Sequence, residues 1–140
     1  MNVKSIIKSL LVCGAFVIFA TSAQADDKTA AAVESAKRWL ALVDGAQYAK
    51  SWQEAAPFFK AQVNAKIWEE QISAVRAPLG KAESRELVGA QFVNELPGAP
   101  EGEFVVIQFK TDFANKPDSV ETITPMMVDG SWRVSGYFIR

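Results

Sequence analysis

The sequence predicts an α+β domain in which N-terminal helices pack on a curved antiparallel sheet of about four strands. Up to Gly80 the apolar residues recur at intervals of three and four, which is the spacing of one face of a helix. After Gly80 they alternate with polar residues, as in a half-buried strand. Asp129-Gly130 is a two-residue hairpin signal between two apolar runs, and it favours antiparallel pairing.

Two helical stretches open the predicted domain. The first runs from Lys28 to Val43 and ends at Asp44-Gly45. Its apolar face is made by residues three and four apart, namely Val33, Ala36, Leu40 and Val43. The second stretch, from Tyr48 to Phe59, contains Pro57, which lacks a backbone N–H. We therefore expect two short helical pieces there, with a break near Ala56.

A further helix is predicted after Asn64, whose side chain can cap a helix N-terminus. The residues expected to face inward are Ile67, Trp68, Ile72 and Val75. This helix closes at Pro78-Leu79-Gly80, because proline and glycine favour a helix stop. The helical half of the chain is thus expected to end near Gly80.

The first two predicted strands are separated by a proline- and glycine-rich loop that begins at Pro97. The first strand, Leu87 to Leu96, is expected to place Val88, Ala90 and Phe92 on one face. The second strand directs alternate apolar residues toward the core, namely Val105, Ile107, Phe109 and Phe113. Phe104 and Val106 make its other face partly apolar too, so both faces are expected to be covered near its start.

The last two strands form the predicted hairpin. A turn at Asn115 to Asp118 leads into the third strand, Val120 to Val128, and the fourth carries Trp132, Val134 and Phe138. Pro125 within the third strand implies a sheet edge or a bulge, and Gly136 implies a bend in the fourth. We therefore expect the sheet to be curved.

Residues 1–25 have the pattern of a secretory signal peptide, which leaves one domain, residues 26–140. Lys4 and Lys8 precede an apolar run from Leu10 to Ala20, and Ala23-Gln24-Ala25 predicts cleavage after Ala25. The expected location is periplasmic or secreted, with a retained signal anchor as the rival interpretation. No later stretch approaches the roughly 20 apolar residues that cross a bilayer, so an integral membrane protein is not predicted.

Composition excludes several classes of chemistry. The chain has 140 residues and no histidine, and its one cysteine, Cys13, lies within the apolar run. Disulfides, thiol nucleophiles, serine-histidine dyads and histidine or zinc sites are therefore excluded from residues 26–140, and no metal or cofactor is predicted. Without Lys4 and Lys8, 13 basic and 16 acidic side chains leave a net charge of −3, which does not favour nucleic-acid binding.

Several separated motifs, in order, resemble the domain of unknown function 4019 family of exported bacterial proteins. They are Trp39 to Asp44, Tyr48 to Trp52, Trp68, Arg76 to Gly80, Leu96 to Gly98 and Asp129 to Tyr137. The resemblance covers nearly all of the domain and implies no activity. The predicted architecture is similar to the cystatin-like, nuclear-transport-factor-2-like cone, in which a bent sheet leaves a pocket and functions range from isomerisation to dimerisation.

One carboxylate in an apolar setting could act as a base in such a cone, because desolvation raises its pKa. The candidates are Asp44, Asp112 and Glu121, with Tyr48 or Tyr137 as donors to an oxyanion. Structural roles are favoured instead, since Asp44 precedes a helix-ending glycine and Asp112 lies near a strand end. No catalytic residue is assigned.

Aromatic walls suit ring-shaped or lipidic ligands, and the predicted ligand-binding residues are Trp52, Trp68, Arg76 and Tyr137. The structural alternative places the tryptophans in the core, because they fall at the spacing of the apolar faces. Arg76 could instead bond the last carbonyls of its helix and pair with Glu69 or Glu70.

The favoured function is a non-catalytic exported module that binds a small apolar ligand or a partner protein. It requires the face that carries Phe104 and Val106 to be partly exposed. The alternative is a small cone-fold enzyme, of isomerase or lyase type, that uses a buried carboxylate. A homodimer through the open sheet is compatible with either.

Overall fold

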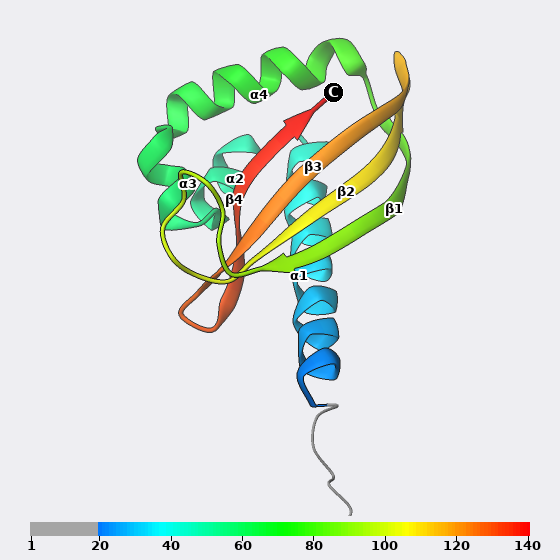
Figure 1. Cartoon of the computed structure of the whole chain (residues 1–140). Helices are drawn as coiled ribbons and strands as arrows, with labels where there is room; N and C mark the ends of the chain where they lie inside the picture. Colours follow the sequence, from blue (N-terminus) through cyan, green and yellow to red (C-terminus); the bar gives the residue numbers. More distant parts are fainter. Residues whose placement is uncertain (1–19) are drawn as a thin grey trace, which may run out of the picture.

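The computed structural model describes residues 20–140, and an α+β arrangement is confirmed (Figure 1). The elements in chain order are α1 (Ala20–Asp44), α2 (Tyr48–Glu54), α3 (Pro57–Gln62), α4 (Ala65–Leu79), β1 (Ala82–Val93), β2 (Phe104–Phe113), β3 (Lys116–Val128) and β4 (Ser131–Ile139). The basic start of the predicted signal peptide and Cys13 lie outside the described residues. Within residues 20–140, no helix is both long enough and apolar enough to span a membrane.

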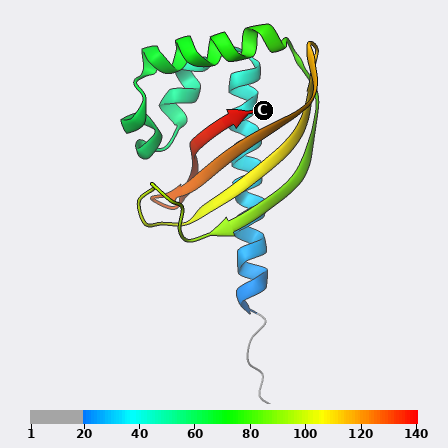
Figure 2. The same cartoon turned by 45° about the horizontal axis from the view of Figure 1, so that its top comes forward.

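The four strands form one antiparallel sheet in the order β1-β2-β3-β4, so β1 and β4 are its edges. The sheet is strongly curved and bends around α1, as the two views show (Figures 1 and 2). α1 contacts all four strands, and α4 crosses one end of the sheet. The helices therefore lie on the inner face of the curve, which agrees with the predicted layer arrangement.

The core lies between α1 and the inner face of the sheet. Val105, Ile107 and Phe109 of β2 are buried there, as their alternation predicts. They meet Leu40 and Val43 of α1, which are also buried. Removing each of these side chains from water contributes about 1.5–3 kcal/mol, so this contact stabilises the packing of α1 on the sheet.

The β3–β4 hairpin turns at the predicted residues. Asp129 and Gly130 have φ values of 47° and 81°, and positive φ at both positions is the geometry of a type I′ turn. Pro125 lies on an inner strand, next to a register shift between Thr124 and Pro125. The bulge alternative is therefore the correct one, because a shifted register accommodates a residue without an N–H.

The helix breaks also fall where the sequence predicts them. Ala55 and Ala56 separate α2 from α3. Asn64 caps α4 by accepting a hydrogen bond from the backbone N–H of Ile67 at 2.9 Å. α1 begins at Ala20 rather than Lys28, since alanine, the best helix former, recurs throughout the added segment.

Two residues of α4 that were expected to face inward do not. Ile67 and Val75 are 42% and 47% exposed. Trp68 and Ile72 are buried as predicted, together with Arg76, and these three residues are spaced four apart. The helix lies across the end of the sheet and buries only this narrow stripe, whereas a central helix would bury a wider face.

The strand predictions need three corrections. β1 spans Ala82–Val93 rather than Leu87 to Leu96. Val88 is 64% exposed, because a register shift between Leu87 and Gly89 turns it away from the core while Ala90 and Phe92 remain packed on it. β3 begins at Lys116 rather than Val120, since Lys116 already pairs with Phe113 across a short turn.

Phe104 is completely buried, which agrees with the expected covering of both faces at the start of β2 but does not give the exposure that the binding hypothesis required there. It packs with Ala56 and Met126 in a second, smaller cluster, which the loop after β1 covers through Leu96 and Ala99. Val106 alone keeps the intermediate exposure expected of this face. The sequence pattern predicted that both faces would be covered near the start of β2, but it did not identify the loop after β1 as the segment that covers the second face.

Candidate functional site

A polar network crosses the inner face of the sheet, with one residue from each strand. Arg85 of β1 lies opposite Thr111 of β2 in the strand register. Glu121 of β3 and Tyr137 of β4 occupy neighbouring inward positions. These residues share one end of the inner face because inward-pointing positions on paired strands align across a sheet. We call Arg85, Thr111, Glu121 and Tyr137, together with Asp44 and Arg76 of the helices, the polar network.

Glu121 is the centre of this network and is 0% exposed. Its Oε1 accepts hydrogen bonds from Arg85 Nε at 2.7 Å and from Thr111 Oγ1 at 2.5 Å. Its Oε2 accepts a hydrogen bond from the hydroxyl of Tyr137. Burial, together with the negative charge of Glu121, raises the pKa of Tyr137, so this hydroxyl stays protonated as a donor.

Asp44, the last residue of α1, joins two arginines. It accepts from Arg76 Nη2 at 2.8 Å and from Arg85 Nη1 and Nη2 at 2.8 and 3.0 Å. Partial burial acts to raise the pKa of Asp44, but the hydrogen bonds from Arg85 and Arg76 outweigh it and hold the pKa below its ordinary value. The negative charges of Asp44 and Glu121 are therefore balanced by the positive charges of Arg76 and Arg85.

Arg76 has a different partner from the one the sequence suggested. Its side chain is buried, pairs with Asp44 and lies over the ring of Phe113 at 4.9 Å from the ring centre. The expected pairing with Glu69 or Glu70 is wrong, because both lie on the exposed side of α4. Arg76 thus closes the end of the network instead of capping its own helix.

The predicted ligand-binding residues do not form one site. Trp68 and Tyr137 share an apolar groove of about 240 Å³ between α4 and β4, whose other lining residues are Gln71, Ile72, Val75, Phe138 and Ile139. Trp52 lies elsewhere, with its indole N–H donating to the carbonyl of Val63 at 2.8 Å. Arg76 is engaged by Asp44. Ligand binding by these residues stays a prediction.

All four tryptophans contribute to the core, and Trp52 does so as a partly buried residue packed against it. The indole N–H of Trp39 donates to the carbonyl of Ser51 at 2.8 Å, and that of Trp68 donates to the hydroxyl of the same serine at 3.0 Å. Trp39 also meets Tyr137 edge-on, with 5.4 Å between ring centres. Trp132 packs partly buried against the same cluster. These contacts favour the structural alternative for the aromatic residues.

The remaining catalytic candidates lie outside the network. Asp112 accepts from the backbone N–H of Asp118 at 2.8 Å and from the hydroxyl of Ser84 at 3.2 Å. The backbone hydrogen bond is the main reason that the pKa of Asp112 is lowered, and it fixes the turn between β2 and β3. Tyr48 packs half-buried at the edge of the core. Neither residue lies beside Glu121.

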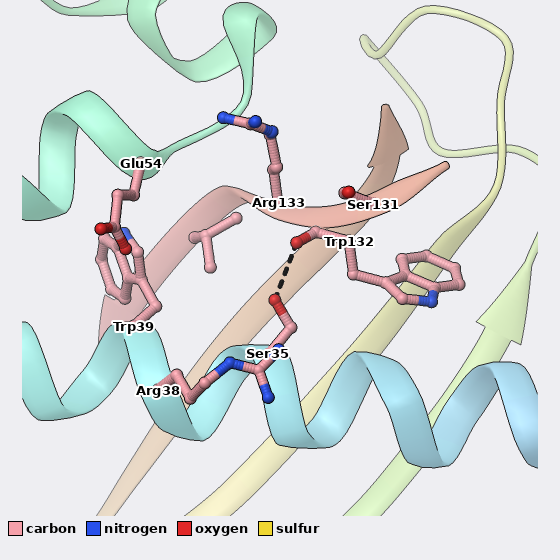
Figure 3. A pocket seen from close by; sticks show the side chains of 8 residues that line it. Ser35, Arg38, Trp39, Glu54, Ser131, Trp132 and Arg133 are labelled. Carbon is pink, nitrogen blue, oxygen red and sulfur yellow. Dashed lines mark hydrogen bonds between the residues drawn. The ribbon is translucent and has the colours of Figure 1, made fainter. Parts of the chain in front are cut away.

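Sequence reasoning did not find a cleft of about 350 Å³ where α1, α2 and β4 meet (Figure 3). Its lining comprises Ser35, Arg38, Trp39, Glu54, Ser131, Trp132, Arg133 and Val134, which we call the arginine cleft. Arg38 and Arg133 are 95 positions apart in the chain, so no local motif could bring them together. Only the packing of α1 beside the edge strand does so.

This geometry defines the class of the protein. It is a small α+β domain with an open, curved antiparallel sheet and a polar network on the inner face of that sheet. The chain belongs to the family described as "Protein of unknown function (DUF4019)", whose model matches residues 35–137. The resemblance drawn from the sequence motifs is therefore confirmed. No curated protein and no solved structure matches the chain, so the cystatin-like cone stays a prediction.

Proposed function

We propose that this domain is a non-catalytic exported module that binds its ligand or partner at the surface rather than inside the curve of the sheet. The enclosure of Glu121 is the observation that carries this proposal. No part of Glu121 is exposed, and both carboxylate oxygens already accept hydrogen bonds from the protein. A substrate atom could reach the carboxylate only by displacing Arg85, Thr111 or Tyr137.

Glu121 does meet the burial that the enzyme alternative requires, but the groups around it are committed to one another. Asp44, whose pKa is lowered, is a weaker base than an ordinary aspartate. Tyr137, whose pKa is raised, already donates its proton to Glu121 and is not free to serve an oxyanion. These acid and base groups stabilise the fold and leave no position for a reacting atom.

Hollows on the surface support a binding role. The apolar groove beside Trp68 carries Val75 and Phe138, which are 47% and 55% exposed. The arginine cleft, at about 350 Å³, reaches the size range of small-molecule sites. Exposed apolar side chains around a hollow favour binding over a purely structural role.

Export with cleavage after Ala25 is also part of the proposal. Among the described residues of α1, the buried ones begin at Ala32, so the predicted cut removes none of them. The ion pair between Lys28 Nζ and Glu103, at 2.5 Å, would also remain. Cleavage at this point is therefore compatible with an intact core.

Native mass spectrometry of the protein purified from the envelope fraction of its own host tests the binding role. We expect the folded chain to carry a non-covalent additional mass, either a small molecule or a partner. A doubled mass would identify the partner as a second copy of the chain. A bare monomer, obtained under conditions that preserve non-covalent complexes, would contradict the proposal.

A further inference from the structure

β4 is an edge strand of the sheet, and the rest of the fold bonds only to its first half. The carbonyl of Trp132 accepts a hydrogen bond from the hydroxyl of Ser35 at 2.7 Å. The carbonyl of Val134 accepts one from the backbone N–H of Ala56 at 2.8 Å. Contacts of this kind protect an exposed strand edge from pairing with other chains. The end of β4, residues 137–139, is arranged differently.

The hydrogen-bond pattern shows which backbone groups the end of β4 leaves free. Val120 and Arg140 exchange two backbone hydrogen bonds, at 2.8 and 3.0 Å. In an antiparallel pair such residues alternate with residues whose N–H and C=O point away from the neighbouring strand. The register is unbroken from Ile139 back to Gly136, so Ile139 and Tyr137 point theirs away from β3. Within residues 20–140, no backbone hydrogen bond reaches these outward groups.

Tyr137 and Ile139 also line the apolar groove between α4 and β4, which we call the β4 groove. Its volume is about 240 Å³. Figures 1 and 2 show that α4 passes across the end of β4. Val75 of α4 and Phe138 of β4, both in the lining, are 47% and 55% exposed. A strand edge with free donors and acceptors, beside exposed apolar side chains, is a surface to which an extended peptide can add a strand.

Charge and size select the occupant of the β4 groove. None of its seven lining residues carries a charge, although 16 acidic and 13 basic side chains leave residues 26–140 negatively charged. A charged segment would lose its hydration there without an opposite charge to replace it. The volume also lies below the roughly 300–1,000 Å³ of small-molecule sites. The groove therefore favours uncharged, apolar side chains of a longer chain over a free small molecule.

We propose that the β4 groove binds an extended, uncharged apolar segment of a partner polypeptide, which adds to the four-stranded sheet as a fifth strand. The backbone of this segment bonds the outward N–H and C=O groups of Tyr137 and Ile139. Alternate side chains of the segment point the same way, so they enter the groove together and contact Ile72 and Val75. The inference rests on the proposed function, and it names the site and the chemistry of the partner.

The test uses blocked seven-residue peptides in which threonine alternates with valine, leucine or phenylalanine. Each peptide is titrated into the ¹⁵N-labelled protein, and amide hydrogen exchange is followed by NMR. At least one of the three should bind saturably and slow exchange at Tyr137 and Ile139 about tenfold or more, because both amides gain a hydrogen bond. The matched peptide with glutamate in place of its apolar residues should not bind.

Ile139→Pro tests the backbone contact. It removes an N–H that points away from β3, so the pairing of β4 with β3 is kept, and proline is tolerated on an edge strand. Peptide affinity should fall about tenfold or more, because the added strand loses a hydrogen bond. Ile139→Ala shortens the same side chain but keeps the N–H, so it should lose less affinity. Circular dichroism establishes that each variant is folded.

Val75→Glu and Ile67→Glu test the apolar wall without changing the backbone of β4. Both residues lie on α4 and are exposed, at 47% and 42%, so both variants should fold normally. Val75 lines the β4 groove and Ile67 does not. Val75→Glu should therefore weaken peptide binding about tenfold or more, because it places a charge beside the apolar segment, and Ile67→Glu should change it little.

Three results would overturn the proposal. The first is that none of the three apolar peptides binds saturably. The second is binding that Ile139→Pro and Val75→Glu both leave unchanged, or that leaves exchange at Tyr137 and Ile139 fast. The third is a dimer in which these two amides are protected without any peptide, which would place a second copy of the chain in the β4 groove.

The failure of this inference and the failure of the proposed function are distinguishable. If the host-purified protein carries an additional mass but no peptide binds, the β4 groove is not the site and the binding module stands. If the host-purified chain is bare, the proposed function itself is contradicted, whatever the peptides do.

Discussion

Arg85 forms ion pairs with two carboxylates from distant parts of the chain. Its Nε donates to Glu121 at 2.7 Å, and its Nη1 and Nη2 donate to Asp44 at 2.8 and 3.0 Å. One side chain on an edge strand therefore links the end of α1 to an inner strand of the sheet. Burial acts to lower the pKa of Arg85, but its hydrogen bonds to Asp44 and Glu121, together with their negative charges, outweigh burial and raise the pKa, so Arg85 stays charged.

Replacing Arg85 should strongly destabilise the fold. Arg85→Gln would leave the buried Glu121 without its counter-charge, and we expect a loss of about 3–5 kcal/mol in the free energy of unfolding. Arg85→Lys keeps the charge but cannot bridge both carboxylates, so its loss should be intermediate. Urea denaturation measures both. Lys37→Gln breaks only an exposed pair with Glu34 and should cost less than about 1 kcal/mol. Similar losses for Arg85→Gln and Lys37→Gln would show that the polar network is not structural.

The hydroxyl of Tyr137 should stabilise the fold separately from the packing of its aromatic ring. Tyr137→Phe keeps the edge-on contact with Trp39 but leaves Oε2 of Glu121 without its donor. We expect a loss of about 1–3 kcal/mol, the cost of a buried acceptor that has lost its partner. Thermal and urea unfolding measure it. A variant as stable as the wild type would mean that Glu121 does not depend on this hydroxyl.

Stability should fall in acid because the pKa of Asp44 is lowered in the folded state. An unfolded aspartate titrates near pH 3.9, so the folded protein binds fewer protons than the unfolded chain around and below that pH. The contribution is thus complete at neutral pH and is lost as pH falls through the folded pKa. Asp44→Asn should be less stable than the wild type at pH 7, and the gap should close toward pH 2. A gap that stays constant between pH 7 and pH 2 would contradict this assignment.

Gly130, in the turn between β3 and β4, should tolerate substitution less well than Gly136, which lies within β4. Gly130 has φ 81°, so Gly130→Ala should cost about 1–2 kcal/mol through backbone strain. Gly136, on β4, lacks a positive φ and has open space where a Cβ would lie, so Gly136→Ala should change stability by less than about 0.5 kcal/mol. Urea midpoints compare the two variants. An equal effect at both positions would argue against the type I′ turn.

Local signals in the sequence predicted local structure well. The Asp129-Gly130 turn, the Asn64 cap and the break before Pro57 each depend on a few neighbouring residues, and all are confirmed. Val88 was placed wrongly because a bulge shifts the register of β1, and the pattern of apolar residues carries no sign of it. Burial of Phe104 was expected from the two apolar faces of β2, but its covering residues, Leu96 and Ala99 on the loop directly before it, were not predicted.

The site was harder to predict than the fold. Asp44, Glu121 and Tyr137 were recognised as candidates, but Arg85 lies 41 positions from Asp44 and 36 from Glu121. Only tertiary packing shows that these groups neutralise one another. The arginine cleft is a similar case, since Arg38 and Arg133 come from elements that are far apart in the sequence.

The most direct test of a non-catalytic role compares the wild type with Glu121→Gln, both purified from the native host and measured by native mass spectrometry. Circular dichroism first establishes that the variant is folded. If Glu121 only stabilises the fold, both proteins should carry the same additional mass in similar amounts. An additional mass that accumulates on Glu121→Gln alone, or that differs chemically from the wild type's, would show that Glu121 acts on the bound molecule and would contradict the account.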